Sequence, residues 1–78
     1  MSRHGAIDVG LSSPPDRETL VADLMIDHEQ LAEIRPDGDR YLVELYAKRD
    51  GSVWQVDSDD LRSAVIAAIE LLNDRRGR

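Results

Sequence analysis

His28 is one of two histidines in this 78-residue chain, and its neighbours make it the first candidate for chemistry. It stands between Asp27 and Glu29, a grouping that suggests a metal site or a general base. Zinc needs three or four ligands, and general-base catalysis needs a partner held in fixed geometry. We therefore expect His28 to be a solvated residue at the end of a helix, and we predict neither a metal site nor a catalytic histidine.

Two aspartate-rich segments invite comparison with calcium sites. Asp37 and Asp39 flank a glycine, and residues 57–60 read Asp-Ser-Asp-Asp. A calcium loop of the EF-hand type needs a spaced ligand set, a glycine at its sixth position and a closing glutamate, and neither segment provides them. A turn and a helix start account for both segments. The serines also lack a nucleophile motif, and there is no glycine-rich phosphate loop, so we predict a non-enzymatic protein without a cofactor.

Carboxylates outnumber the basic groups in this chain. There are 16 Asp and Glu residues against 10 Lys and Arg, for a net charge of −6. Residues 4–74 hold all 16 acidic residues and only 6 of the basic ones, because Arg3, Arg75, Arg76 and Arg78 lie near the ends. This balance argues against a general nucleic-acid or anionic-membrane binder and favours a basic protein partner.

We predict that two groups of residues bind such a partner. The first group is an acidic cluster at the start of an expected helix: Asp57, Asp59 and Asp60. The second lies on one face of an expected sheet, where Tyr and Leu among charged side chains are typical of an interface: Glu33, Glu44, Tyr46, Leu42 and Gln55. Two alternatives for this sheet face are burial under an N-terminal helix and burial in a symmetric homodimer.

The length allows one domain, and several classes of protein are excluded by composition. Cysteine is absent, so there is no disulfide framework and no thiolate metal site. No apolar run approaches the ~20 residues that span a bilayer. The first five residues lack the apolar stretch of a secretory signal, and we expect a cytoplasmic protein.

Residues 1–12 support two interpretations. Ile7, Val9 and Leu11 alternate with Asp8 and Gly10, which suits a short strand. Two glycines among six residues weaken a strand and favour a flexible arm. We assign residues 13–78 to a single α+β domain.

Residues 14–27 are expected to form a helix. Ser13 can cap its first turn, and Pro14 lies where no amide donor is needed. The apolar residues that follow recur at spacings of three and four, as on one helical face. The alternative is a strand over residues 19–26; the capping signal favours the helix.

Three strands are expected next, over residues 31–35, 40–47 and 52–56. The first two are joined by a turn at residues 36–39, and the second pair by Asp50 and Gly51, a two-residue hairpin signal. The sequence therefore predicts a three-stranded antiparallel meander.

The two turns fix a register that sorts the side chains into two faces. A four-residue first turn pairs Arg35 with Arg40, and a two-residue second turn places Leu45 opposite Val56. One face is then apolar: Ala32, Ile34, Tyr41, Val43, Leu45, Ala47, Trp54 and Val56. The other is mixed: Leu31, Glu33, Leu42, Glu44, Tyr46, Lys48, Val53 and Gln55.

A C-terminal helix is expected to follow, with Ser58 as its cap and Gly77 as its stop. Acidic residues suit its positive end, and Arg75 and Arg76 suit its negative end. An apolar stripe runs along it and should cover the apolar sheet face: Leu61, Val65, Ala68, Ile69 and Leu72.

These features favour an inhibitor that occludes a basic, nucleic-acid-binding site on a larger protein or ribonucleoprotein. In general plan (small, acidic, single-domain and cofactor-free) the chain is similar to phage-encoded anti-CRISPR proteins and to immunity proteins. The resemblance covers size and charge, and no residue role follows from it. The alternative is an antitoxin-like or regulatory module that dimerises and contacts nucleic acid through its basic C-terminal end.

Overall fold

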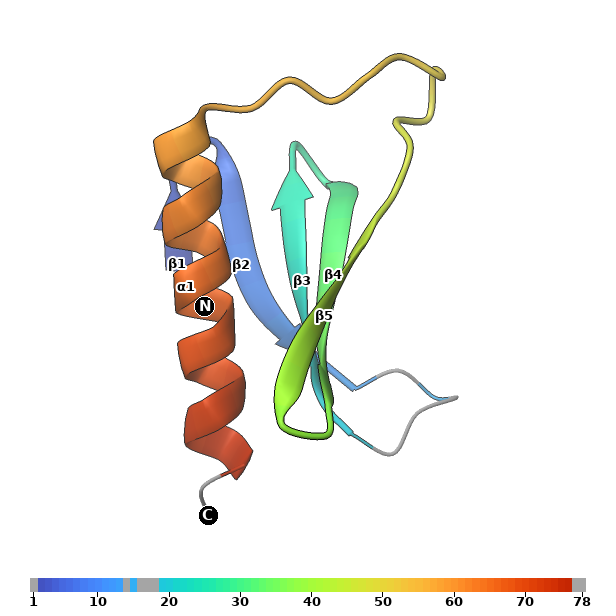
Figure 1. Cartoon of the computed structure of the whole chain (residues 1–78). Coiled ribbons are helices and arrows are strands. Elements are labelled where there is room, and N and C mark those ends of the chain that lie inside the picture. Colours follow the sequence, from blue (N-terminus) through green and yellow to red (C-terminus); the bar gives the residue numbers. More distant parts are fainter. Residues whose placement is uncertain (1, 14, 16–18, 77–78) are drawn as a thin grey trace.

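The structure is a computed structural model, and it describes residues 2–13, 15 and 19–76. One antiparallel sheet and one helix make up the fold (Figure 1). The elements follow in the order β1 (Ser2–His4), β2 (Ile7–Ser12), β3 (Val21–Ile26), β4 (Glu29–Asp37), β5 (Arg40–Leu45) and α1 (Ser58–Arg76). Neighbouring strands in the sequence are neighbours in the sheet, whose order is β1-β2-β3-β4-β5. The predicted α+β class and C-terminal helix are confirmed, but the sheet has five strands instead of three.

The predicted helix over residues 14–27 is wrong for its second half, which forms β3. Leu24 pairs with β2 on one side and with β4 on the other, so β3 is the central strand of the sheet. The apolar residues of this segment fit both a helical face and a strand, and cross-strand pairing decides between them. Pro14 and residues 16–18, which carry much of the expected capping signal, lie outside the described residues.

A tight turn at Asp27 and His28 joins β3 to β4 and ends the strand where the helix was expected to end. The φ angles are 50° at Asp27 and 66° at His28, and Ile26 pairs with Glu29. Two successive residues at positive φ are typical of the two-residue turn that matches strand twist. His28 is therefore a turn residue and not the end of a helix.

The hairpin of β4 and β5 is present, but its predicted register is wrong. Asp37 pairs with Arg40, so the turn consists of Gly38 and Asp39, and Gly38 has a φ of 64°. Arg35 therefore pairs with Leu42 instead of Arg40. This is a shift of two residues, and because side chains alternate with a period of two, every side chain keeps its predicted face.

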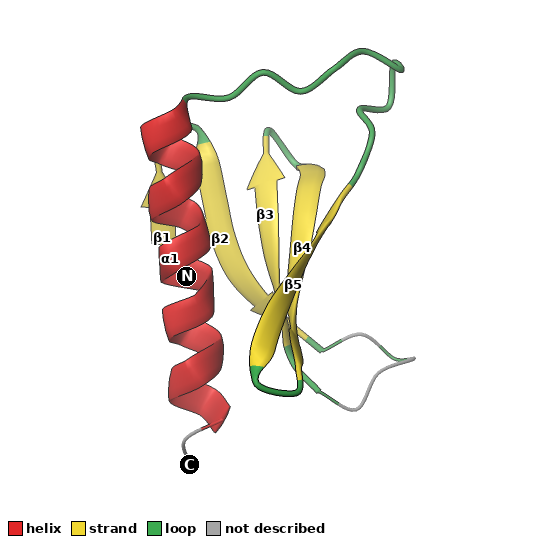
Figure 2. Cartoon of the chain, viewed as in Figure 1, coloured by secondary structure: helices red, strands yellow, loops and turns green. Residues whose placement is uncertain are grey.

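The predicted strand over residues 52–56 is wrong, because residues 46–57 cross the end of the sheet as a long connection (Figure 2). The turn before it does form: Gly51 has a φ of 83°, and its amide donates to the carbonyl of Lys48 at 3.0 Å. The chain must travel from β5 at one edge to the start of α1, which lies against the turn between β1 and β2 at the other edge. That distance is about 19 Å, four inter-strand spacings. A hairpin with Val56 beside Leu45 would leave one residue to cover it.

The core lies between α1 and the face of the sheet formed by β1 to β4. Small residues on the helix allow it to approach the sheet closely, and Ala64 and Ala68 are both fully buried. The larger side chains of this core are Leu72 from the helix and, from the sheet, Ile7, Val9, Leu24, Leu31 and Ile34.

The apolar face continues beyond the cover of the helix. Ala32 and Ile34 are buried as predicted, but Val43 and Leu45, which share their face, are 45% and 69% exposed. The reason is that α1 packs on β1 to β4, while β5 lies at the edge beyond it.

Candidate functional site

The acidic cluster at the start of α1 caps the helix. Asp57 Oδ2 accepts two hydrogen bonds from backbone amides, one from Asp59 at 3.0 Å and one from Asp60 at 3.1 Å. Asp57 is therefore the cap, and the prediction that Ser58 caps the helix is wrong by one residue. A carboxylate at this position satisfies orphan amides and also faces the positive end of the helix dipole.

Of the other two carboxylates of this cluster, Asp59 has a partner within the chain and Asp60 packs against a turn. Asp59 accepts a hydrogen bond from Arg62 at 3.2 Å, one helical turn away. Asp60 lies against the turn between β1 and β2, where a Cβ on Gly5 would overlap its carboxylate. The structure thus brings the three predicted residues together at one helix end, where each contributes to local structure.

A second set of carboxylates lies on the face of the sheet opposite α1. Asp23 on β3 pairs with Glu33 on β4, and Glu33 pairs with Glu44 on β5. Residues directly opposite each other share a face, and their Cβ atoms are about 5 Å apart. We call these three residues the carboxylate row. It confirms that Glu33 and Glu44 share one face, and it adds Asp23, which the helix assignment had hidden.

Among the described residues, one arginine lies beside the carboxylate row. Arg35 Nη1 is 2.7 Å from Glu44 Oε1 and 3.8 Å from Glu33 Oε2. Glu33 is only 8% exposed, although no helix in the described part of the chain covers this face. The Arg35 guanidinium therefore forms ion pairs with two members of the row, Glu33 and Glu44.

Asp23 lies at the other end of the row, in a less solvated environment. Its Oδ1 accepts a hydrogen bond from Gln30 at 2.8 Å. Burial raises the pKa of the Asp23 carboxyl above its ordinary value, and a hydrogen bond with Ser12 opposes this shift. The carboxylate at this end is thus partly desolvated and is held by neutral groups.

A hollow of about 260 Å³ opens beside Asp23. Gly10 on β2 pairs with Asp23, and because it has no side chain it leaves a gap at the end of the row. Asp8 and Met25, which pair with each other, form the adjacent wall. The hollow therefore combines two carboxylates with an apolar surface, which suits the stem and head of a long basic side chain.

The remaining predicted partner-binding residues are divided between this face and the connection. Leu42 pairs with Arg35, shares its face and is 38% exposed. Tyr46 was placed on the same face at the end of the second expected strand, but β5 ends at Leu45, and Gln55 was placed there by a third strand that does not form; both lie in the connection at residues 46–57. The Tyr46 carbonyl accepts a hydrogen bond from Trp54 Nε1 at 2.9 Å, which ties the connection to the end of β5.

His28 is exposed in its turn, where its carbonyl accepts a hydrogen bond from Arg49 Nη2 at 3.2 Å. Within residues 2–13, 15 and 19–76, no three His, Cys, Asp or Glu side chains converge in a way that could hold a metal ion. The arrangement around His28 therefore offers no acid–base or metal chemistry beyond that of a surface imidazole.

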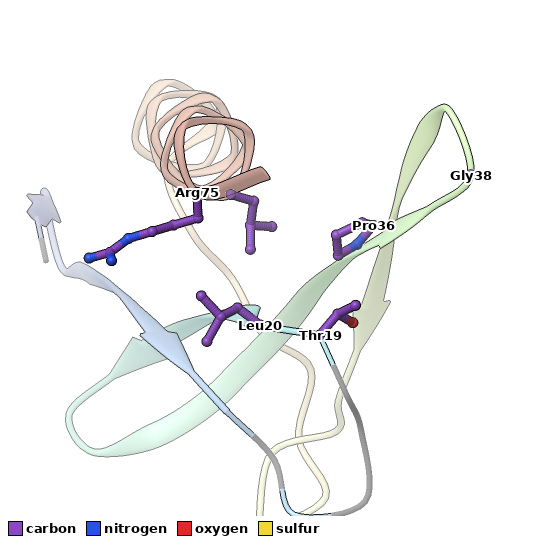
Figure 3. Close-up of a pocket in the computed structure, with 6 residues that line it drawn as sticks. Thr19, Leu20, Pro36, Gly38 and Arg75 are labelled. Carbon is purple, nitrogen blue, oxygen red and sulfur yellow. The ribbon is translucent and has the colours of Figure 1, made fainter. Parts of the chain in front are cut away.

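A cavity of about 410 Å³ lies between the C-terminal end of α1 and the β4–β5 turn (Figure 3). Figure 3 shows Arg75 on one side and Pro36 and Thr19 on the other, with Leu20 between them. Leu72 and Gly38 complete the lining. The described residues that line it are mainly apolar and include no carboxylate, imidazole or thiol that could act as an acid, base or strong nucleophile.

Helix α1 is not apolar enough over a sufficient length to span a membrane, and it is the only helix among the described residues. Comparisons with protein-family models, curated proteins and solved structures found no match to this chain.

Proposed function

We propose that this chain is a non-enzymatic binding protein that docks its helix-free sheet face on a basic surface of a larger protein or ribonucleoprotein. The partner surface would be one that otherwise binds nucleic acid, so that docking inhibits the partner by occlusion. The observation that supports this proposal is the carboxylate row of Asp23, Glu33 and Glu44, which runs across three adjacent strands with one arginine beside it.

The row is costly to the isolated protein, which argues for a role in binding. Like charges directly opposite each other on neighbouring strands destabilise a sheet. Arg35 compensates the Glu44 end, whereas Asp23 is held by Gln30 and Ser12, which are neutral. A lysine or arginine from a partner, placed in the hollow beside Gly10, would bring a positive charge to Asp23; Asp8 on the adjacent wall already lies 3.9 Å from Arg3 Nε.

The sheet holds the carboxylate row on a rigid surface, which suits recognition of a partner. Each member of the row is held in a strand that belongs to one continuous sheet, and the opposite side of β1 to β4 is packed against α1. Side chains fixed in this way lose little conformational freedom on binding, which favours affinity. The acidic balance of the whole chain adds long-range attraction to a basic partner, and this attraction weakens as salt rises.

The proposed activity is that of a cytoplasmic inhibitor built on the same general plan as anti-CRISPR and immunity proteins. Such a protein imitates the negative charge of nucleic acid without its phosphates. The competing proposal is that the basic C-terminal end contacts nucleic acid directly. The two make opposite predictions about which macromolecule the purified chain binds.

The first test measures affinity for a basic probe, a fluorescein-labelled nona-arginine peptide, by fluorescence anisotropy at several salt concentrations. The test variant is Glu33→Gln with Glu44→Gln, which removes two charges from the row and keeps the side-chain shapes. The matched control is Asp59→Asn with Glu70→Gln, which removes two charges from α1. We expect about tenfold weaker binding for the test variant, as for the loss of about 1.4 kcal/mol, and near wild-type binding for the control.

Equal weakening of both variants would contradict the proposal, because it would show that only net charge matters. A labelled single-stranded oligonucleotide provides the second arm of the test. Binding of the oligonucleotide by the wild-type chain, lost on deletion of residues 75–78, would favour the competing proposal instead.

A further inference from the structure

Strand β5 forms one edge of the sheet and pairs with β4 only, as far as the described residues show. Just after β5, the Tyr46 amide donates to the Leu31 carbonyl on β4 at 3.0 Å. Backbone groups alternate in direction along an antiparallel strand, so those of Val43 and Leu45 point away from β4. Such an outward row of donors and acceptors is a template for another strand.

The two edges of this sheet differ in how they are protected. Natural edges are usually short, charged, bulged or interrupted by proline. β1 has three residues and carries Arg3 and His4, whereas β5 has six residues without proline or lysine. The one register shift in the sheet lies between β3 and β4, away from β5. The edge at β5 is therefore long and has neither a proline nor a bulge, and its two charged residues are Arg40 and Glu44.

The side chains of β5 make this edge apolar as well. Leu42, Val43 and Leu45 are 38%, 45% and 69% exposed. Val43 and Leu45 continue the core-forming face of the sheet beyond α1, so a neighbouring strand would extend that face. Three exposed apolar side chains on one unprotected edge strand are typical of a surface that associates.

We infer that β5 pairs antiparallel with β5 of a second copy of this chain, around a two-fold axis that passes through Leu42. An axis perpendicular to the sheet keeps both copies of α1 on the same side. In this register Arg40 lies opposite Glu44 of the second copy, and Val43 lies opposite Tyr41 of the second copy. The two Leu42 side chains meet at the axis. Opposite charges and apolar pairs directly across two strands both stabilise a sheet.

Other registers match less well. An axis through Val43 places Leu42 opposite Glu44 of the second copy, and Arg40 opposite Tyr46. An axis through Glu44 brings two like charges together. An axis between two residues would oppose side chains that belong to different faces, which the pleat does not allow. The Leu42 register is the one in which both the charged and the apolar positions are complementary.

Residues 52–56, the segment of this chain expected to cover β5, are occupied elsewhere. Residues 52–56 cannot pair with β5, because Asp57 alone would then have to reach the start of α1 across the sheet. Trp54 is also held by its hydrogen bond to the Tyr46 carbonyl and packs against the core. A second copy is therefore the occupant that the charges and the chain geometry favour.

This inference does not rest on the proposed function. Asp23 and Glu33 lie on the interior strands β3 and β4, and joining two copies at β5 leaves both on the open face; only Glu44, on β5, belongs both to the row and to the proposed dimer contact. A monomeric wild-type chain would not argue against nona-arginine binding at the row, and a lack of nona-arginine binding would not argue against the dimer.

The oligomeric state is measured by size-exclusion chromatography with light scattering over a dilution series. We expect the wild-type chain at twice the mass of one chain. Val43→Pro removes an outward amide and spares the bonds to β4, and we expect it at the mass of one chain with an unchanged circular dichroism spectrum. The control is Val53→Pro, the same substitution at a residue 81% exposed in the connection, which should remain dimeric.

The register is tested by charge exchange with Arg40→Glu and Glu44→Arg, each prepared as a single variant. Each alone places like charges across the axis, and we expect both to be monomeric. Their equimolar mixture restores both ion pairs, and we expect a heterodimer. A monomeric wild-type chain at millimolar concentration, a dimeric Val43→Pro variant, or a mixture that stays monomeric would overturn the inference.

Discussion

Replacing Asp57 by alanine separates a structural role from a recognition role for the acidic cluster at the start of α1. The Asp57 carboxylate accepts two backbone hydrogen bonds, from Asp59 and Asp60. Alanine removes the acceptor and the charge together. Asparagine keeps the acceptor and removes only the charge, so the pair of variants divides the effect into its two causes.

The expected magnitude follows from these contacts. Loss of a helix cap costs about 1 kcal/mol, and loss of a carboxylate from the positive end of a helix costs about 0.3–1 kcal/mol. Asp57→Ala should therefore lower the free energy of unfolding by about 1–2 kcal/mol. For a domain of this size, each kcal/mol corresponds to about 4–8 °C in Tm. Asp57→Asn should show only the smaller, charge-dependent part.

Thermal unfolding followed by circular dichroism at 222 nm measures both variants. An unchanged Tm for Asp57→Ala would refute the capping role. Equal losses for the two variants would show that charge and not hydrogen bonding stabilises the helix start. If Asp57→Asn keeps its affinity for nona-arginine, Asp57 has no direct part in recognition of that probe.

Three further predictions concern the turns and the carboxylate row. Gly5→Ala should cost about 1–3 kcal/mol in a urea unfolding curve, because Gly5 has a φ of 61° and no room for a Cβ. Gly51→Ala, at a φ of 83° in open space, should cost less, and equal losses would contradict the overlap. Asp27→Asn with His28→Gly should increase the free energy of unfolding by about 1 kcal/mol and therefore raise Tm, since both residues have positive φ and the new residue types adopt it with less strain. An unchanged Tm in differential scanning calorimetry would contradict this. Burial raises the pKa of Asp23, so the folded state binds a proton more readily than the unfolded state and its stability falls as pH rises through the folded pKa. Asp23→Asn should be more stable than wild type at pH 7 and equal to it at pH 3 in urea unfolding; the reverse order would refute the shift.

The parts of the fold with strong local signals were predictable. The helix over 58–76 has an acidic start and an apolar stripe, and the strands around residues 36–39 have a turn between two β-rich runs. Even the wrong register there preserved the faces, since the shift was two residues. Glu33, Glu44 and Leu42 were thus placed correctly on one face.

The failures arose where non-local geometry overrides a local pattern. Val21 and Leu24 fit a helix by spacing, but Val21 pairs with β2, and Leu24 pairs with β2 on one side and β4 on the other. Asp50 and Gly51 do form a turn, yet the path to α1 prevents a hairpin. Asp23 was missed for the same reason as β3. The signal for this strand in the sequence is the pair Asp27 and His28, residue types that tolerate positive φ, directly after an apolar segment.

The most direct test of the proposed docking face is line broadening in ¹H–¹⁵N spectra when spin-labelled nona-arginine is added to the ¹⁵N-labelled chain. We predict saturable, salt-sensitive broadening centred on the amides of Gly10, Asp23, Glu33 and Glu44. Broadening centred on the first turn of α1, or spread evenly over all acidic residues, would contradict the account.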